Sequence, residues 1–130
     1  MSNAVRLPRK LAFEPLLLAP GMYNPDLRAK MHGKSGVYIL RRLGRLRPDY
    51  VGESHTNRAW KTMLRHLQGI ASFRARGEWA PCGCPAKYEV AWIPARGEKA
   101  MAIEARAIRR YRPIANIAEA ARAVLKEVGF

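Results

Sequence analysis

The chain has 130 residues, enough for one domain with a hydrophobic core. Lys and Arg number 24 against 10 Asp and Glu, a formal charge of +14, so a polyanion such as DNA or RNA is the expected partner. The apolar runs are too short to span a membrane. The two cysteines, Cys82 and Cys84, are separated by a single residue, a spacing that suits neither a local disulfide nor a zinc site. With no signal-peptide pattern, we expect a protein of the bacterial cytoplasm or nucleoid.

Residues 1–34 are the part of the chain with the least regular pattern. Four prolines punctuate this stretch and prevent a long helix. Asn24-Pro25-Asp26 is typical of a turn or helix start, and it predicts a short helix over Leu27–His32. We therefore predict an N-terminal extension over 1–34 that packs on a single core domain over 35–130.

A β-hairpin is predicted at the start of the core domain. Residues 36–42 and 49–53 are rich in strand formers, and a glycine and a proline between them indicate a turn. Tyr38 and Tyr50, one on each strand, would project from one face if they lie opposite each other. Two aligned tyrosines are most often hydrophobic packing, so this pair alone does not indicate a catalytic site.

The next predicted element is a helix over 58–68, ended by the glycine that follows. Arg58 and Arg65 are seven residues apart and share one side of it, near Lys61. His66 falls at the boundary between the two sides, where it could reach an adjacent sheet. For a lone helix, a solvated basic side is the simpler interpretation. The opposite, buried side is predicted to consist of Trp60, Met63, Leu64 and Leu67.

The second half of the chain predicts a third strand and two more helices. An irregular connection over 69–86 leads to an alternating strand over 87–93. A helix over 98–111 is stopped by Pro113, and a final amphipathic helix is expected over 118–128.

Glu104 stands out in the helix over 98–111. It is spaced three and four residues from members of an expected apolar stripe, so it should project from the buried side. A buried carboxylate is destabilising unless it meets a cation or a metal. A salt bridge to an arginine is the simpler interpretation, and a divalent cation held against a phosphate is the alternative. The expected stripe consists of Met101, Ala105, Ile108 and Tyr111.

The order of these elements resembles the GIY-YIG endonuclease superfamily. The resemblance covers roughly residues 35–117. Its C-terminal part is similar to the nuclease domain of the bacterial nucleotide-excision-repair endonuclease, and the part after Tyr50 is more like small stand-alone bacterial and phage members. It implies an α+β fold with a small three-stranded antiparallel sheet flanked by helices. The residues that carry it are Gly36-Val37-Tyr38, Tyr50-Val51-Gly52, Arg58 and His66 on a helix, Glu104, and Pro113 with Asn116.

The resemblance implies hydrolysis of DNA phosphodiester bonds with one divalent ion, Mg²⁺ or Mn²⁺, bound by Glu104. Tyr38 would act as general base or position the attacking water, and Tyr50 would assist by hydrogen bonding. Arg58 would neutralise charge on the phosphate, and His66 would orient Tyr38 or help in proton transfer. The remaining residues would support the site (Gly36, Gly52 and Asn116) or contact the DNA backbone (Lys61 and Arg65).

One spacing departs from the family. Arg58 and His66 are two turns apart, whereas one turn is usual, and Thr62 stands four residues before His66, where an arginine is expected. Arg58 is the preferred catalytic arginine, with Arg65 next and Lys61 as a further alternative.

Three functions therefore remain. The first is an active endonuclease, acting alone, as a homodimer or with a recruiting protein. The second is a nucleic-acid-binding module on the same fold with little or no catalysis. The third is a basic RNA-binding or ribosome-associated protein whose tyrosines stack on bases.

Overall fold

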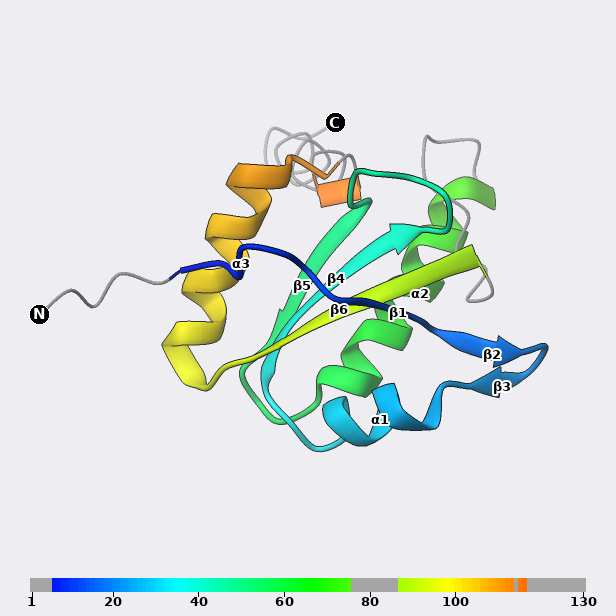
Figure 1. Cartoon of the computed structure of the whole chain (residues 1–130), viewed down its shortest axis with the longest axis horizontal. Helices are drawn as coiled ribbons and strands as arrows, with labels where there is room; N and C mark the ends of the chain where they lie inside the picture. The colour runs from blue at the N-terminus through cyan, green and yellow to red at the C-terminus, as the bar shows by residue number, and fades with distance from the viewer. Residues whose placement is uncertain (1–5, 76–86, 114, 117–130) are drawn as a thin grey trace, which may run out of the picture.

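The computed structural model describes residues 6–75, 87–113 and 115–116, and the fold is α+β (Figure 1). The main sheet is antiparallel, with the strand order β1-β6-β4-β5, and β2 and β3 form a separate small sheet. The strands are β1 (Phe13–Pro15), β2 (Leu17–Ala19), β3 (Met22–Tyr23), β4 (Gly36–Arg42), β5 (Tyr50–Ser54) and β6 (Tyr88–Pro94). The helices are α1 (Pro25–Met31), α2 (Ala59–Ala75) and α3 (Gly97–Tyr111).

The predicted hairpin is confirmed as β4 and β5, and its register shows how the two tyrosines lie. Tyr38 lies opposite Gly52, and Tyr50 lies opposite Leu40. The two tyrosines are therefore diagonal neighbours on one face rather than a directly opposed pair. Asp49 helps to fix this register, because its N–H donates to the carbonyl of Leu40 at 2.7 Å.

The main sheet has one strand more than the sequence predicted. In β1, Phe13 pairs with Ala91 and Pro15 pairs with Glu89, so the extension covers the outer edge of β6. A bare edge presents unpaired N–H and C=O groups, which β1 partly satisfies. Arg41 holds the strands together, with its guanidinium 3.7 Å from the Phe13 ring centroid and 2.6 Å from the Glu89 carboxylate. A three-residue strand ending in proline is too short to give a recognisable alternation.

The helix α2 extends past the predicted end at Gly69 and continues to Ala75. A glycine inside a helix costs only about 1 kcal/mol relative to alanine, which is too little to end a helix that packs well. Together with α1, α2 covers the face of the sheet that carries Tyr38 and Tyr50. Its buried side is as predicted and consists of Trp60, Met63 and Leu67, with Leu64 half-buried beside them.

The helix α3 covers the opposite face, and its predicted apolar stripe was wrong at Met101 and Ala105 but right at Ile108 and Tyr111. Met101 is 49% exposed and Ala105 is also exposed. The helix packs through small side chains, which allow it to lie close to the sheet. Glu104 is half-buried at the margin of this contact. The contact consists of Ala100, Ile103 and Ala107 against Val37, Ile39 and Val51, with Ile108 and Tyr111 packed beside them.

The bounds of the other predicted strands and helices agree with the observed bounds within two residues. The strand predicted over 87–93 is β6, and the helix predicted over 98–111 is α3. The helix α1 begins before the predicted Leu27 because the Asn24 side chain caps it, accepting hydrogen bonds from the N–H groups of Asp26 and Leu27 at 3.1 and 3.3 Å.

Some predictions lie outside the described residues. They are the helix over 118–128 and the part of the irregular connection over 76–86 that contains Cys82 and Cys84. Within the described part of the chain, none of the helices combines the length and the apolar character needed to cross a membrane.

Candidate active site

Tyr38, Tyr50 and His66 meet between the main sheet and α2. The Tyr38 hydroxyl and His66 Nδ1 share a hydrogen bond. The Tyr50 ring meets the same imidazole edge-on, with 5.0 Å between ring centroids, and the Tyr38 ring centroid is 5.7 Å away. His66 is half-buried at the boundary position that the sequence predicted. One imidazole therefore contacts both tyrosine rings.

Both tyrosines are buried in this arrangement. Tyr38 is 0% exposed and Tyr50 is 5% exposed. A phenol hydroxyl removed from water needs a hydrogen-bonding partner, and His66 supplies one to Tyr38. Of these three side chains, His66 is the one nearest to solvent.

The two glycines predicted to support the site have a steric role. A Cβ at Gly52 would overlap the ring carbons and the hydroxyl of Tyr38. A Cβ at Gly36 would overlap the Ile93 carbonyl and come within 2.6 Å of Trp92 Cη2. Because β5 is an edge strand, the absent side chain at position 52 lets the Tyr38 phenol extend across it toward the free edge of the sheet.

Arg58 immediately precedes α2 and is exposed. Its N–H donates to Ser54 Oγ at 3.1 Å, and its carbonyl accepts from the N–H of Thr62 at 2.9 Å. The serine at the end of β5 therefore fixes the chain at the point where the helix begins. This places Arg58 beside the end of the edge strand.

Arg58 is nevertheless far from the imidazole along the helix. Eight residues separate it from His66, which corresponds to about 12 Å of helix rise. Thr62, one turn before His66, is half-buried. Lys61 and Arg65 are exposed on the same helix, so with Arg58 they form a basic surface, which we call the α2 basic stripe.

Glu104 lies on α3, which packs on the other face of the sheet. The first residue of α3 and the turn after β5 line one pocket. At the other end, the Tyr111 carbonyl accepts a hydrogen bond at 3.4 Å from Arg47, which precedes β5. The helix α3 therefore runs alongside β5 (Figure 1). It packs on one face of the sheet, and the Tyr38 ring lies on the other.

Asn116 holds the free edge of β5. Its Oδ1 accepts from the N–H of Val51 at 2.8 Å, and its Nδ2 donates to the carbonyl of Val51 at 2.8 Å. These are backbone groups of an edge strand, which has no neighbouring strand on that side. The N–H of Ala115 also donates to the carbonyl of Asp49 at 3.1 Å. The chain that follows α3 is therefore tied to the strand that carries Tyr50.

Asp49 is a buried carboxyl group that the sequence analysis did not single out. It is 7% exposed, and burial raises the pKa of its carboxyl above the ordinary value, although the Arg42 N–H bond and the charges of Arg42 and Arg45 oppose the rise. The Arg42 N–H donates to Asp49 Oδ2 at 3.1 Å, so the side chain closes the hairpin. An aspartate after a proline in a turn gives no sequence signal of burial.

The metal-binding capacity of the described residues is limited. They contain no group of three or more His, Cys, Asp or Glu side chains that could hold an ion. Glu104 is a single half-buried carboxylate. Mg²⁺ is commonly bound by one or two carboxylates and completes its shell with water and substrate phosphates. Glu104 therefore fits an open site of this kind and not a closed all-protein cage.

No protein-family model matches the chain, and no curated protein matches it. Among solved structures, the chain is similar to the GIY-YIG N-terminal endonuclease domain of UvrC from Thermotoga maritima, a point mutant bound to its catalytic divalent cation. The match has 25% sequence identity and a TM-score of 0.40, and it covers 69% of this chain and 93% of that one. The described residues form an α+β fold with an antiparallel main sheet, as the sequence predicted. The described main sheet has a fourth strand, β1, from the N-terminal extension.

Proposed function

We propose that the protein is a metal-dependent endonuclease that hydrolyses phosphodiester bonds in DNA. The hydrogen bond between Tyr38 and His66 supports this most directly, because it links a phenol at the edge strand to a group that can accept or donate a proton. In this proposal Tyr38 takes a proton from the attacking water, and His66 holds the hydroxyl or carries the proton away. Tyr50, in contact with the same imidazole, keeps the ring in place and adds a hydroxyl near the phosphate.

The distribution of positive charge supports DNA as the substrate. A formal charge of +14 favours a polyanion, and the α2 basic stripe presents three cations from α2 and the residue that precedes it. Such cations contact phosphates and read no sequence. Arg58 would stabilise the charge that develops on the phosphate, since a guanidinium binds phosphate oxygens in a fork. We place this activity in the bacterial cytoplasm or nucleoid.

Glu104 is the proposed ligand of one Mg²⁺ or Mn²⁺ ion. When bound, such an ion stabilises negative charge on the phosphate and lowers the pKa of a coordinated water. The chain contributes a half-buried carboxylate on α3, which packs on the opposite face of the sheet from Tyr38. A cut in both DNA strands from a single site of this kind would require a second copy of the chain or a recruiting protein, so single-strand nicks are the expected product.

The second candidate is a DNA-binding module on the same fold with little or no catalysis. Two observations favour it: Tyr38 is 0% exposed, and the Arg58 side chain starts two turns from His66. This candidate predicts DNA binding without cleavage and no requirement for Glu104.

Nicking of supercoiled plasmid in Mg²⁺ or Mn²⁺ distinguishes the two candidates. The wild type should nick the plasmid. The nicking rate of Glu104→Gln should be lower by at least about 100-fold, the loss typical when a group that stabilises transition-state charge is removed. Glu98→Gln, which removes the same charge from an exposed position on α3, should nick as the wild type does. If the wild type shifts the plasmid in a gel but never nicks it, and Glu104→Gln shifts it equally well, the binding module is the correct function.

A further inference from the structure

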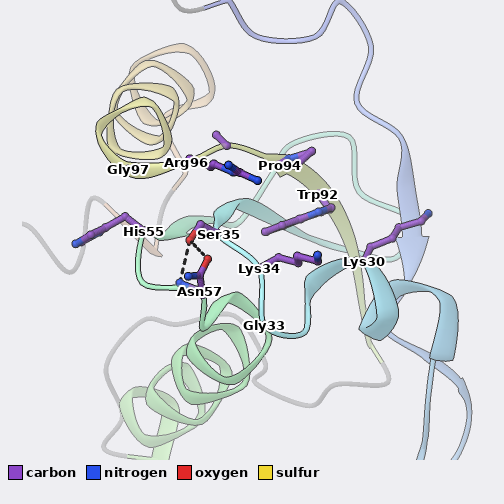
Figure 2. A pocket seen from close by; sticks show the side chains of 11 residues that line it. Lys30, Gly33, Lys34, Ser35, His55, Asn57, Trp92, Pro94, Arg96 and Gly97 are labelled. Carbon is purple, nitrogen blue, oxygen red and sulfur yellow. Dashed lines mark hydrogen bonds between the residues drawn. The ribbon is translucent and has the colours of Figure 1, made fainter.

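A pocket of about 1030 Å³ opens at one end of the main sheet (Figure 2). Its walls come from the turn after α1, the turn between β5 and α2, the end of β6 and the start of α3. None of the proposed catalytic residues lines it. Its volume is sufficient for a nucleotide, since small-ligand pockets usually measure about 300–1,000 Å³. The side chains used below are Lys34, Ser35, Asn57, Trp92 and Arg96.

The charge of the pocket suits an anion. Its described lining includes Lys30, Lys34 and Arg96 and no aspartate or glutamate. Lys30 is paired with Glu14 at 2.8 Å, whereas neither Lys34 nor Arg96 forms an ion pair with a described residue. The helix α3 begins at Gly97 in the pocket wall without a side-chain cap, so the positive end of its dipole adds to these two cations.

Trp92 adds an aromatic surface between the two cations. Figure 2 shows its side chain between those of Arg96 and Lys34. The indole is half-buried and lies against Gly36, whose lack of a side chain makes room for the ring. An indole flanked by cations matches the two parts of a nucleotide, because bases stack on aromatic side chains and phosphates bind to Lys and Arg.

The turn between β5 and α2 gives the pocket a fixed wall. Ser35 Oγ donates to Asn57 Oδ1 at 2.9 Å, and the N–H of Asn57 donates to Ser35 Oγ at 2.9 Å. Asn57 has a φ of 60°, a left-handed conformation that asparagine tolerates better than most residues. The next residue is Arg58, so the pocket opens beside the start of the α2 basic stripe.

We propose that this pocket takes one unpaired nucleotide of a DNA substrate, with its base stacked on Trp92 and its phosphate bound by Lys34 and Arg96. This inference rests on the proposed function only in taking DNA as the ligand. It gives the protein a preference for DNA with a single-stranded segment beside a duplex. The protein then recognises the shape of its target and not its sequence.

The test compares the binding of two labelled DNAs to the full chain by fluorescence anisotropy in EDTA, where metal-dependent cleavage cannot occur. One DNA is a blunt duplex, and the other is the same duplex with a short single-stranded tail. The wild type should bind the tailed DNA at least about fivefold more tightly, the lower bound expected from stacking one base. Lys34→Ala/Arg96→Ala should abolish this preference. Arg109→Ala/Arg110→Ala, which removes the same charge from exposed positions at the far end of α3, should retain it.

Trp92 provides a second pair of variants. Trp92→Leu should lose the preference and Trp92→Phe should keep most of it, with thermal melting to show that both fold. Equal binding of the two DNAs by the wild type, or a preference that survives in Lys34→Ala/Arg96→Ala, would overturn the proposal, as would a failure to bind either DNA. The plasmid assay is independent of these results. If the protein prefers tailed DNA but never nicks the plasmid, the proposal for the pocket stands and the proposed nuclease function is wrong.

Discussion

The Tyr38 ring occupies the space that a side chain at position 52 would need. Tyr38 and Gly52 are directly opposite in the hairpin, and a Cβ at Gly52 would overlap both the ring and its hydroxyl. We expect Gly52→Ala to displace the ring, break its hydrogen bond with His66 and lower the free energy of unfolding by about 1–3 kcal/mol, as overpacking of a tight core does. Urea denaturation measures this change.

The matched control for Gly52→Ala is the same substitution in a chain that carries Tyr38→Ala. Without the ring, the added methyl group meets no obstacle, so its effect on the free energy of unfolding should fall by at least half. An equal effect in both backgrounds would show that the glycine is required for a reason other than the tyrosine.

Asn116 should contribute to stability through its two hydrogen bonds to Val51. Removing both in Asn116→Ala leaves an N–H and a carbonyl of the edge strand without these partners, and we expect a loss of about 1–3 kcal/mol in the free energy of unfolding. Asn116→Asp retains the acceptor for the Val51 N–H but sets a carboxylate oxygen against the Val51 carbonyl, so it should not restore stability. A neutral effect of both variants would rule out the role of Asn116 in holding β5.

Asp49 predicts a specific dependence of stability on pH. Burial raises the pKa of its carboxyl in the folded chain, with Arg42 and Arg45 opposing the rise, so the folded chain binds this proton more tightly than the unfolded chain does. The wild type therefore loses stability as the pH rises through the raised pKa. Asp49→Asn keeps an acceptor for the Arg42 N–H and removes the titrating group.

We expect Asp49→Asn to be more stable than the wild type at pH 7. The difference should shrink as the pH falls toward about 4, near the ordinary pKa of aspartate, because the folded carboxyl then keeps its proton and the unfolded one begins to bind it. Urea denaturation of both proteins at three pH values between these limits measures the trend. A difference that is constant across this range, or a variant that is less stable at pH 7, would contradict the prediction.

The strands and helices could be predicted where the periodicity of apolar residues coincides with residues that start or end an element. The hairpin, the strand β6 and the helix α3 follow from such patterns, and the boundary position of His66 follows from helical spacing alone. The failures have local causes. The strand β1 is stabilised by pairing with β6 and has only three residues, so no alternation marks it. Met101 is apolar but exposed, because the alanines of α3 pack more closely on the sheet than a methionine could.

The candidate site was less predictable than the fold because it depends on relationships between elements. The sequence contains Gly52 but does not show that the Tyr38 ring crosses it, and it contains Asn116 but does not show that Val51 is its partner. The pocket around Trp92 combines three separate segments of chain, and no spacing along the sequence brings them together.

The position of the proposed catalytic arginine can be tested at Thr62. This half-buried residue lies one turn before His66, so an arginine there would start about 6 Å from the imidazole along the helix instead of about 12 Å. If the nuclease is limited by the distance of Arg58, Thr62→Arg should increase the nicking rate by about tenfold or more, since a well-placed donor to the transition state is worth at least that much. It should also restore nicking to Arg58→Ala.

Thr62→Lys separates geometry from charge. It adds the same charge as Thr62→Arg without the planar fork that binds two phosphate oxygens. The increase in nicking rate should therefore be clearly smaller than that of Thr62→Arg. Plasmid nicking rates of the two variants, each with and without Arg58→Ala, give the comparison. If Thr62→Arg changes nothing while Arg58→Ala abolishes nicking, Arg58 already reaches the phosphate from the start of α2. Loss of nicking in Arg65→Ala alone would instead assign the role to Arg65.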